Sequence, residues 1–205
     1  MKRAEYPLAW PARVEKAENA ACIDISGSYK AGNGDSLLPF FLFGINETSS
    51  HEWSELVQIN EQILAEPDDS TVTIRFIDAD RIEVAVAIRG TPVARHVLKR
   101  SNLSASVAEM WLGQDDQTFR CDPDSVVTAG AYVSDWVKFR LPYEERKRLY
   151  RPRDIRHAGT SHGYFDFSKA IDGSLVMRER RFFCVDCGNL NDRWRRWEAV
   201  LSPPR

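Results

Sequence analysis

The two cysteines in Cys184-Val185-Asp186-Cys187-Gly188 form the arrangement in this sequence that is best suited to chemistry. A Cys-x-x-Cys pair followed by glycine resembles half of a zinc knuckle, in which the glycine frees backbone amides to face the sulfurs. Tetrahedral zinc needs two more ligands, and the sequence has no second Cys-x-x-Cys pair. The other candidate ligands are Cys22, Cys121, His157 and His162. The sequence therefore allows a zinc site at Cys184 and Cys187 with half of its ligand set unspecified.

The same two cysteines have other interpretations. A thioredoxin-like redox pair needs its first cysteine at a helix N-terminus, which lowers the pKa of the thiol, whereas residues 180–185 have the pattern of a strand. The cysteines are otherwise expected to be buried thiols or, in an oxidising compartment, to form a disulfide. The expected bridge then joins Cys121 to Cys184 or to Cys187.

Cys22 is a candidate lipid anchor, because it opens the stretch CIDISGSYK and a cysteine closely followed by Ser-Gly-Ser-Tyr is typical of mature bacterial envelope lipoproteins. The preceding residues 1–21 have a basic start and small residues before the cysteine, but prolines and charged residues interrupt every apolar window. A signal peptide needs an apolar stretch. We therefore expect residues 1–21 to be a flexible arm, or the remnant of a leader, and Cys22 not to be lipidated. As encoded, the chain is expected to be cytoplasmic.

His157 and His162 flank Ala158-Gly159-Thr160-Ser161, which brings two possible bases close in sequence to two hydroxyls. No Gly-x-Ser-x-Gly elbow is present, and no carboxylate is placed to orient either ring. A glycine-containing surface loop is therefore expected here. The acids expected to bond the local backbone in turns are Asp78, Asp80 and Asp172. The sequence predicts no catalytic residue and no cofactor other than zinc, and we expect a protein that is not an enzyme.

The charges are balanced overall but unevenly distributed. Lys and Arg number 28 against 30 Asp and Glu, which gives a net charge of -2 and no general attraction for nucleic acid. Residues 140–156 are locally basic, and this stretch is either a solvated surface or a contact for an anionic partner, such as lipid headgroups, phosphate or nucleic acid. The candidate anion contacts are Arg146, Lys147, Arg148, Arg151 and Arg153.

Residues 194–197, with the sequence Trp-Arg-Arg-Trp, combine aromatic rings with cations near the end of the chain. On a strand, Trp194 and Arg196 lie on one side, and Arg195 and Trp197 lie on the other. We expect one tryptophan to plug a barrel end while an arginine lies across its face. The rival interpretation is that an exposed tryptophan stacks on a nucleic-acid base.

Alternation of apolar and polar residues is the strongest structural signal. It predicts three consecutive strands at 71–76, 82–88 and 93–98, joined by turns at 78–80 and 90–92. Further strands are predicted at 118–121, 133–141, 163–167, 175–184 and 194–201, and helices are predicted at 49–64 and 102–111. The chain of 205 residues is therefore expected to be mainly β, an antiparallel meander that forms a barrel or bent sandwich, with one or two short helices in a single domain at 22–205.

Five stretches are similar to a family of small proteobacterial envelope lipoproteins, and the likeness extends in patches from Cys22 to Val200. They are the start at 22–29, Phe41-Leu42-Phe43-Gly44, Phe119-Arg120-Cys121-Asp122, residues 167–178, and 194–197. The resemblance implies a β fold and a cell-envelope setting. The family has no established activity, so the resemblance implies no catalytic residue. The chain departs from it in its polar leader and in the helix predicted after Gly44.

The function expected from these patterns is that of a non-enzymatic binding or structural protein. A barrel commonly offers a mouth to a small ligand, so a small apolar ligand is the sharper expectation. The alternatives are a zinc or redox protein that uses Cys184 and Cys187, and a nucleic-acid-binding module that uses the stretch from Arg140 to Arg156.

Overall fold

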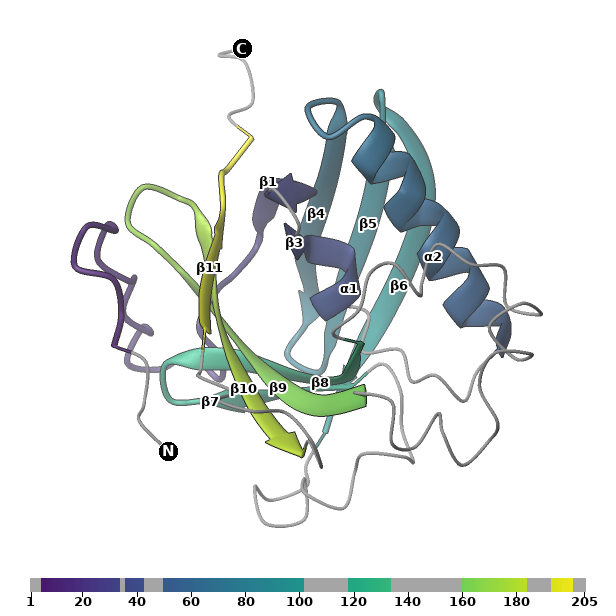
Figure 1. Ribbon diagram of the computed structural model, residues 1–205. Coiled ribbons are helices and arrows are strands. Elements are labelled where there is room, and N and C mark those ends of the chain that lie inside the picture. The colour runs from purple at the N-terminus through teal and green to yellow at the C-terminus, as the bar shows by residue number, and fades with distance from the viewer. Residues whose placement is uncertain are drawn as a thin grey trace.

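The computed structural model describes residues 5–33, 36–42, 50–101, 118–133, 160–183 and 193–200. In this part of the chain nine strands form one sheet that curls into a nearly closed barrel (Figure 1). Their order across the sheet is β1-β4-β5-β6-β7-β8-β9-β10-β11. Neighbouring strands are antiparallel except β6 and β7, which pair in parallel over two residue pairs. The predicted fold class, a mainly antiparallel β barrel with short helices, is confirmed.

The described part of the chain contains a large sheet, a small hairpin and two helices. The strands of the large sheet are β1 Gly27–Lys30, β4 Ser70–Asp78, β5 Arg81–Ile88, β6 Thr91–Arg100, β7 Thr118–Asp122, β8 Ser125–Val133, β9 Thr160–Lys169, β10 Leu175–Phe183 and β11 Arg193–Trp197. The separate small hairpin consists of β2 Gly32–Asn33 and β3 Ser36–Leu37. The helices are α1 Leu38–Leu42 and α2 Ser50–Ala65.

Strands β4, β5 and β6 form the meander that the alternation predicts. At the first turn, the Asp78 carboxylate accepts hydrogen bonds from the backbone N–H of Asp80 at 2.9 Å and from Nε of Arg81 at 2.7 Å. At the second turn, Gly90 has a φ of 73°, which glycine adopts without strain. The two turns are therefore built by the residues that marked them in the sequence.

The second half of the sheet agrees with the predicted strands in part. β7, β9, β10 and β11 coincide with four of them. The strand predicted at 133–141 overlaps β8 only at Val133, and its remainder lies outside the described residues, as does the helix predicted at 102–111. Most of β8 is not predicted, because Val126 and Val127 are both buried and its apolar residues do not alternate.

Backbone hydrogen bonds between β1 and residues 198–200 close the barrel. The N–H of Lys30 donates to the carbonyl of Glu198 at 3.0 Å, and the N–H of Val200 donates to the carbonyl of Ser28 at 2.8 Å. Between them, Tyr29 and Ala199 form an antiparallel bridge. This seam joins β1 to the segment that follows β11, so that β1 does not remain an exposed edge.

The core lies on the inner face of the barrel, and helices α1 and α2 cover its open side (Figure 1). The fully buried side chains of the strands include Tyr29, Val72, Ile74, Val84, Val86, Phe119, Phe165, Phe167, Met177 and Trp197. Leu38 and Leu42 of α1 and Ile59 and Ile63 of α2 belong to the same core. α2 confirms the helix predicted at 49–64, whereas α1 is not predicted. Of the helices that the structure describes, none has the length and hydropathy needed to cross a bilayer.

Candidate functional site

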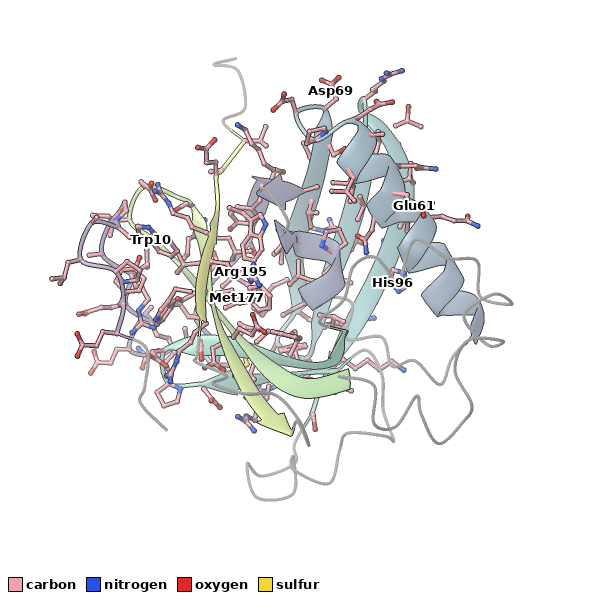
Figure 2. The ribbon with its side chains drawn as sticks, viewed as in Figure 1. Trp10, Glu61, Asp69, His96, Met177 and Arg195 are labelled. Atoms are coloured by element: carbon pink, nitrogen blue, oxygen red, sulfur yellow. A yellow bond between two sulfur atoms is a disulfide. The ribbon has the colours of Figure 1, made fainter. Side chains whose placement is uncertain are left out.

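The inner face of β10 and β11 combines large apolar side chains with a pair of charges. The strand register puts Leu175, Met177 and Glu179 on this face of β10, next to Arg195 and Trp197 of β11. Leu175, Met177 and Trp197 are fully buried. Figure 2 shows Met177 and Arg195 side by side inside the barrel, as expected for residues that face each other in the register. The inner face of these two strands is therefore apolar except at Glu179 and Arg195.

That polar position is an ion pair. Nη2 of Arg195 lies 3.2 Å from Oε2 of Glu179, and the side chains of Glu179 and Arg195 are 1% and 17% exposed. Removing one partner of a buried pair leaves an uncompensated charge and costs about 3–5 kcal/mol. Arg195 is the more accessible of the two, so it is the member that a polar group entering the barrel would meet.

Asn60 places a second polar group against the core. It lies on the same face of α2 as Ile59 and Ile63, and its side chain is buried. Its Oδ1 atom has no hydrogen-bond partner among the described residues. Figure 2 shows His96, from the inner face of β6, between β6 and α2. A buried acceptor without a partner costs about 1–3 kcal/mol, which a suitable donor would recover.

Residues 22–26, which we call the plug, fill the barrel end at which the β4–β5, β7–β8 and β9–β10 turns lie. Ile23 and Ile25 are each 1% exposed, and burial of such a side chain contributes about 1.5–3 kcal/mol. Phe76 and Phe119 belong to the same end and pack edge to face, with 6.2 Å between ring centroids. Cys22 also packs against this core. The plug thus replaces solvent at one end of the apolar interior.

Hydrogen bonds from Tyr29, Phe76 and Lys169 hold the plug in place. The Tyr29 hydroxyl donates to the carbonyl of Ile25 at 2.8 Å, and Nζ of Lys169 donates to the carbonyl of Ser26 at 2.8 Å. The N–H of Phe76 donates to Oγ of Ser26 at 3.5 Å. Burial, assisted by the nearby charge of Asp24, raises the pKa of the Tyr29 phenol far above its usual range, so this hydroxyl remains a donor.

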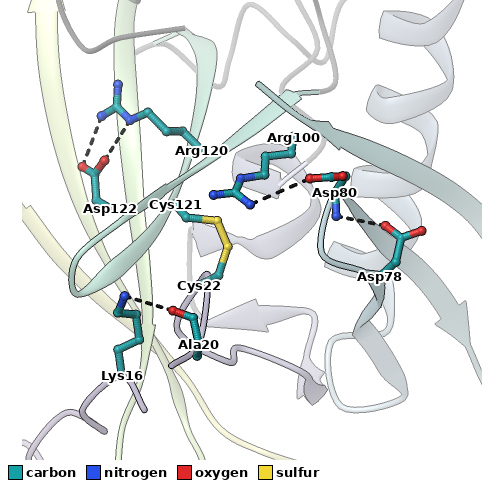
Figure 3. The surroundings of a disulfide bond; sticks show 9 residues. All are labelled: Lys16, Ala20, Cys22, Asp78, Asp80, Arg100, Arg120, Cys121 and Asp122. Atoms are coloured by element: carbon teal, nitrogen blue, oxygen red, sulfur yellow. Dashed lines mark hydrogen bonds and ion pairs between the residues drawn. A yellow bond between two sulfur atoms is a disulfide. The ribbon is translucent and has the colours of Figure 1, made fainter. Parts of the chain in front are cut away.

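A disulfide bond between Cys22 and Cys121 joins the plug to β7 (Figure 3). The two Cα atoms are 5.1 Å apart, and the residues are 99 positions apart in the sequence. This distance lies within the ordinary range for disulfides. The predicted bridge from Cys121 to Cys184 or Cys187 is wrong, because the sulfur of Cys121 is bonded to Cys22.

The disulfide bears on two other hypotheses. Zinc binds cysteine as a thiolate, so Cys22 and Cys121 cannot complete a zinc site with Cys184 and Cys187 while they are bonded to each other. A lipid anchor at Cys22 would use the same sulfur, so a molecule with this disulfide carries no lipid there. Within the described residues, no group of three or more His, Cys, Asp or Glu side chains is arranged to hold a metal ion.

Residues 5–21, which we call the strap, contact the barrel at the β7–β8 turn, at the β9–β10 turn and at Trp194 of β11. The N–H of Val14 donates to the carbonyl of Lys169 at 2.7 Å, and the N–H of Ile171 donates to the carbonyl of Ala12 at 2.9 Å. Arg13 forms an ion pair with Asp124 at 3.1 Å. In the segment expected to be a flexible arm, Tyr6, Ala12, Arg13 and Val14 therefore contact the barrel.

Aromatic contacts extend the docking of the strap. The ring of Tyr6 packs edge to face on Trp10 at 5.9 Å and on Trp194 at 5.0 Å between centroids. The guanidinium of Arg13 lies 5.7 Å from the Tyr6 ring centroid and 5.6 Å from that of Trp194. Cation–π contacts of this kind are worth about 0.5–2 kcal/mol. Figure 2 shows Trp10 at the outer edge of the molecule, on the strap.

The register confirms that Trp194 and Trp197 lie on opposite sides of β11, whereas the expectation that one of them plugs a barrel end stays a prediction. Trp197 is fully buried inside the barrel, and Trp194 faces the outer side. The cation described across the Trp194 ring is Arg13, which belongs to the strap. Local sequence could not reveal this partner, because Arg13 and Trp194 lie at opposite ends of the chain.

Of the three turn acids, Asp78 and Asp172 bond the local backbone as the sequence predicts, and Asp80 pairs with Arg100. The Asp172 carboxylate accepts hydrogen bonds from the N–H of Ser174 at 3.1 Å and from its hydroxyl at 2.7 Å, and it pairs with Arg196. The Ser174 hydrogen bonds and the charge of Arg196 hold the pKa of Asp172 below its usual range. Asp78 and Asp80 pair with Arg81 and Arg100.

Several predicted site residues lie outside the described part of the chain, and their roles stay predictions. They are Cys184, Cys187, His157 and the basic residues Arg146, Lys147, Arg148, Arg151 and Arg153. Thr160, Ser161 and His162 have described backbone at the start of β9, where they belong to a strand and not to the expected loop.

Two residues of the interior, Glu179 and Arg195, are not predicted from the sequence as a site, although a signal exists. Leu175, Met177 and Glu179 alternate along β10 on its buried face, and an acid at such a position demands a buried partner. Arg195 shares a strand face with Trp197. The pairing itself depends on the register of β10 with β11, which the sequence does not specify.

Comparisons with protein-family models, with curated proteins and with solved structures find no match to this chain. The resemblance to envelope lipoproteins therefore stays a prediction. Any functional conclusion for this chain depends on its own side chains and their contacts.

Proposed function

We propose that this is a non-enzymatic binding protein that holds a small apolar ligand between the inner face of its barrel and helices α1 and α2. The observation that carries the proposal is the apolar inner face, to which Val84 of β5, Phe165 of β9 and Trp197 of β11 all contribute. Fold analogy alone would be a weak argument for function. The apolar side chains of the inner face supply a stronger argument.

The size of the barrel supports the same proposal. An eight-stranded barrel has an interior that side chains just fill, or that holds one small ligand, and the diameter grows with the number of strands. The present sheet has nine strands. Helices α1 and α2 supply Leu38, Leu42, Ile59 and Ile63 to this wider interior. A ligand in this proposal enters on the side that the helices cover, since the plug fills one end.

The polar groups of the interior suit a ligand with one hydrogen-bonding end. Asn60 offers an acceptor that has no partner among the described residues, and Arg195 offers donors beside Glu179. In apolar surroundings such contacts orient a ligand more than they attract it. The expected ligand is therefore mainly apolar with a small polar group.

The setting proposed for this function is the cell envelope, by the resemblance to envelope lipoproteins. The Cys22–Cys121 disulfide agrees with that setting, because disulfides persist in oxidising compartments. The zinc and nucleic-acid alternatives depend on residues outside the described part of the chain, and no described contact favours either of them.

Fluorescence of a neutral apolar probe, N-phenyl-1-naphthylamine, tests the proposal. We expect saturable binding, a blue shift of the probe and energy transfer from tryptophan. All six tryptophans of the chain contribute to this transfer, because it acts over distances comparable to the size of the barrel, so the transfer reports binding but not its location.

A matched pair of variants locates the binding. Ala94 is a buried residue of the inner face of β6, and Ala85 lies on the outer face of β5. Ala94→Phe should weaken probe binding about tenfold or more by occupying the interior, and Ala85→Phe should leave it unchanged. Circular dichroism and thermal melts confirm that both variants fold. No saturable binding to the wild type, or equal binding by the two folded variants, would contradict the proposal.

A further inference from the structure

We propose that the Cys22–Cys121 disulfide is a site of thiol–disulfide exchange with a dithiol reductant, and that its reduction opens the plugged end of the barrel. The proposal goes beyond ligand binding and does not depend on it. It rests on where the disulfide lies, on the charges beside it, and on the different ways in which the plug and the strands of the barrel are held.

The disulfide is accessible to a thiol in solution. Cys22 and Cys121 are both partly exposed, so an attacking sulfur is not barred by burial. Cys22 belongs to a segment without regular secondary structure, and Cys121 belongs to the short strand β7. The bond is the covalent connection between the plug and a part of the barrel 99 residues away in the sequence.

The exchange is a two-electron reduction of the protein. A thiolate of the dithiol attacks one of the two sulfurs, the Cys22–Cys121 bond breaks, and the other cysteine leaves as a thiolate that takes up a proton. The second thiol of the reductant then attacks the mixed disulfide. The products are two protein thiols and the oxidised, disulfide form of the reductant.

A cation beside the bond favours this reaction. Arg100 of β6 pairs in register with Phe119 of β7, and Cys121 follows two positions later on the same face. Figure 3 shows the Arg100 guanidinium next to the disulfide, with Asp80 as its ion-pair partner at 3.8 Å. A neighbouring guanidinium stabilises a thiolate, both as the attacking group and as the leaving group.

The plug and strap are held differently from the strands. The plug is attached through the buried Ile23 and Ile25 and through a few hydrogen bonds. The described contacts of the strap are two backbone hydrogen bonds, one exposed ion pair and a few ring contacts. Strands β4, β5 and β6, in contrast, are paired along their whole length. Loss of the covalent bond is therefore expected to release residues 5–26 locally, while the sheet stays folded.

Reduction with dithiothreitol, a dithiol, tests the proposal when it is combined with alkylation and hydrogen exchange measured by mass spectrometry. The protein carries Cys184→Ser and Cys187→Ser, so that one cysteine pair remains. We expect both Cys22 and Cys121 to become alkylated, amide exchange in residues 5–26 to rise about tenfold or more, and exchange in β5 and β6 to change less than about twofold. Reoxidation should restore the original pattern.

A Cys22→Ser, Cys121→Ser double variant separates the effect of losing the disulfide from any other effect of dithiothreitol on the protein. It should show the fast exchange of residues 5–26 without any reductant, and dithiothreitol should have no further effect on it. The proposal is overturned if the disulfide resists reduction in the folded protein, or if residues 5–26 stay protected once it is reduced. It is also overturned if β5 and β6 lose protection together with the plug, since the bond would then brace the whole fold.

Discussion

The β4–β6 meander and the region where the two ends of the chain meet are both parts of one barrel, yet they are held together in different ways. The meander consists of neighbours in sequence, joined by the turns at Asp78 and Gly90. The terminal region, made of the strap, the plug, β1 and residues 193–200, depends on distant partners. Arg13 pairs with Asp124, Cys22 with Cys121, and Tyr29 with Ala199.

This difference has a thermodynamic consequence. A hairpin closes a short loop, whereas contacts between distant residues must overcome the entropy of closing long loops, which grows with the logarithm of loop length. In the terminal region this entropy cost is offset by a few strong interactions, namely those of a fully buried tryptophan, a disulfide and a buried tyrosine hydroxyl. Single substitutions should therefore cost more there than at most positions of the meander, and variants of Trp197, Gly27 and Tyr29 test that expectation.

The largest effect is expected at Trp197. The side chain is fully buried on the inner face of β11, so Trp197→Ala should lower the free energy of unfolding by about 3–5 kcal/mol, through lost burial and the cavity left behind. Chemical denaturation at neutral pH measures this. Trp194→Ala is the matched control, because Trp194 is also a tryptophan of β11 but faces the strap. Its loss should be about 1 kcal/mol, from contacts to Tyr6 and Arg13. Similar losses for the two variants would show that burial inside the barrel is not what makes Trp197 important.

The sequence predicts the meander well, because the signal for it is local. Val72, Ile74 and Phe76 alternate with polar residues, and the buried residues of β5 alternate with Glu83 and with the small Ala85 and Ala87. Each strand buries one face and exposes the other, so the pattern reports the geometry directly. In β8 the consecutive residues Val126 and Val127 are both buried, so both faces of the strand are covered there and the alternating pattern fails as a guide.

The terminal region could be predicted only in pieces. Four cysteines allow three pairings in two bridges, and nothing local favours Cys22 as the partner of Cys121. Trp197 is identified from its strand, but the ion pair of Glu179 with Arg195 requires a register that spacing does not supply. Docking of the strap through Arg13 has no signal at all in its own segment. The interior of the barrel is thus foreseen in its apolar part and not in its polar part.

Gly27 of β1 lies close to the ring of Tyr29, and a side chain at this position would clash with that ring. A Cβ atom built at Gly27 would lie 2.8 Å from Oη and 2.9 Å from Cζ of Tyr29, because the tyrosine ring folds back towards Ile25. Gly27→Ala should therefore lower the free energy of unfolding by about 1–3 kcal/mol, the usual cost of overpacking. In a double-mutant cycle with Tyr29→Leu, which removes the clashing atoms, Gly27→Ala should cost much less. Additive losses in the cycle would show that the ring is not the cause.

The smallest effect is expected for Tyr29→Phe, which removes one hydroxyl and retains the ring. The lost hydrogen bond to the carbonyl of Ile25 should lower the free energy of unfolding by about 1 kcal/mol at neutral pH. The side chain is otherwise unchanged, so the loss reports how far the plug depends on this single donor.

The pH dependence of that loss tests its cause. Burial raises the pKa of Tyr29 in the folded protein, whereas in the unfolded chain the phenol titrates near its ordinary value of about 10. Above that pH the unfolded state binds fewer protons than the folded state, so the stability contributed by the hydroxyl decreases as the pH rises. The difference between wild type and Tyr29→Phe should thus be constant from neutral pH to about 9 and shrink above about 10. A difference that stays constant up to pH of about 11 would mean that the hydroxyl titrates equally in both states and that the plug does not shield it from water.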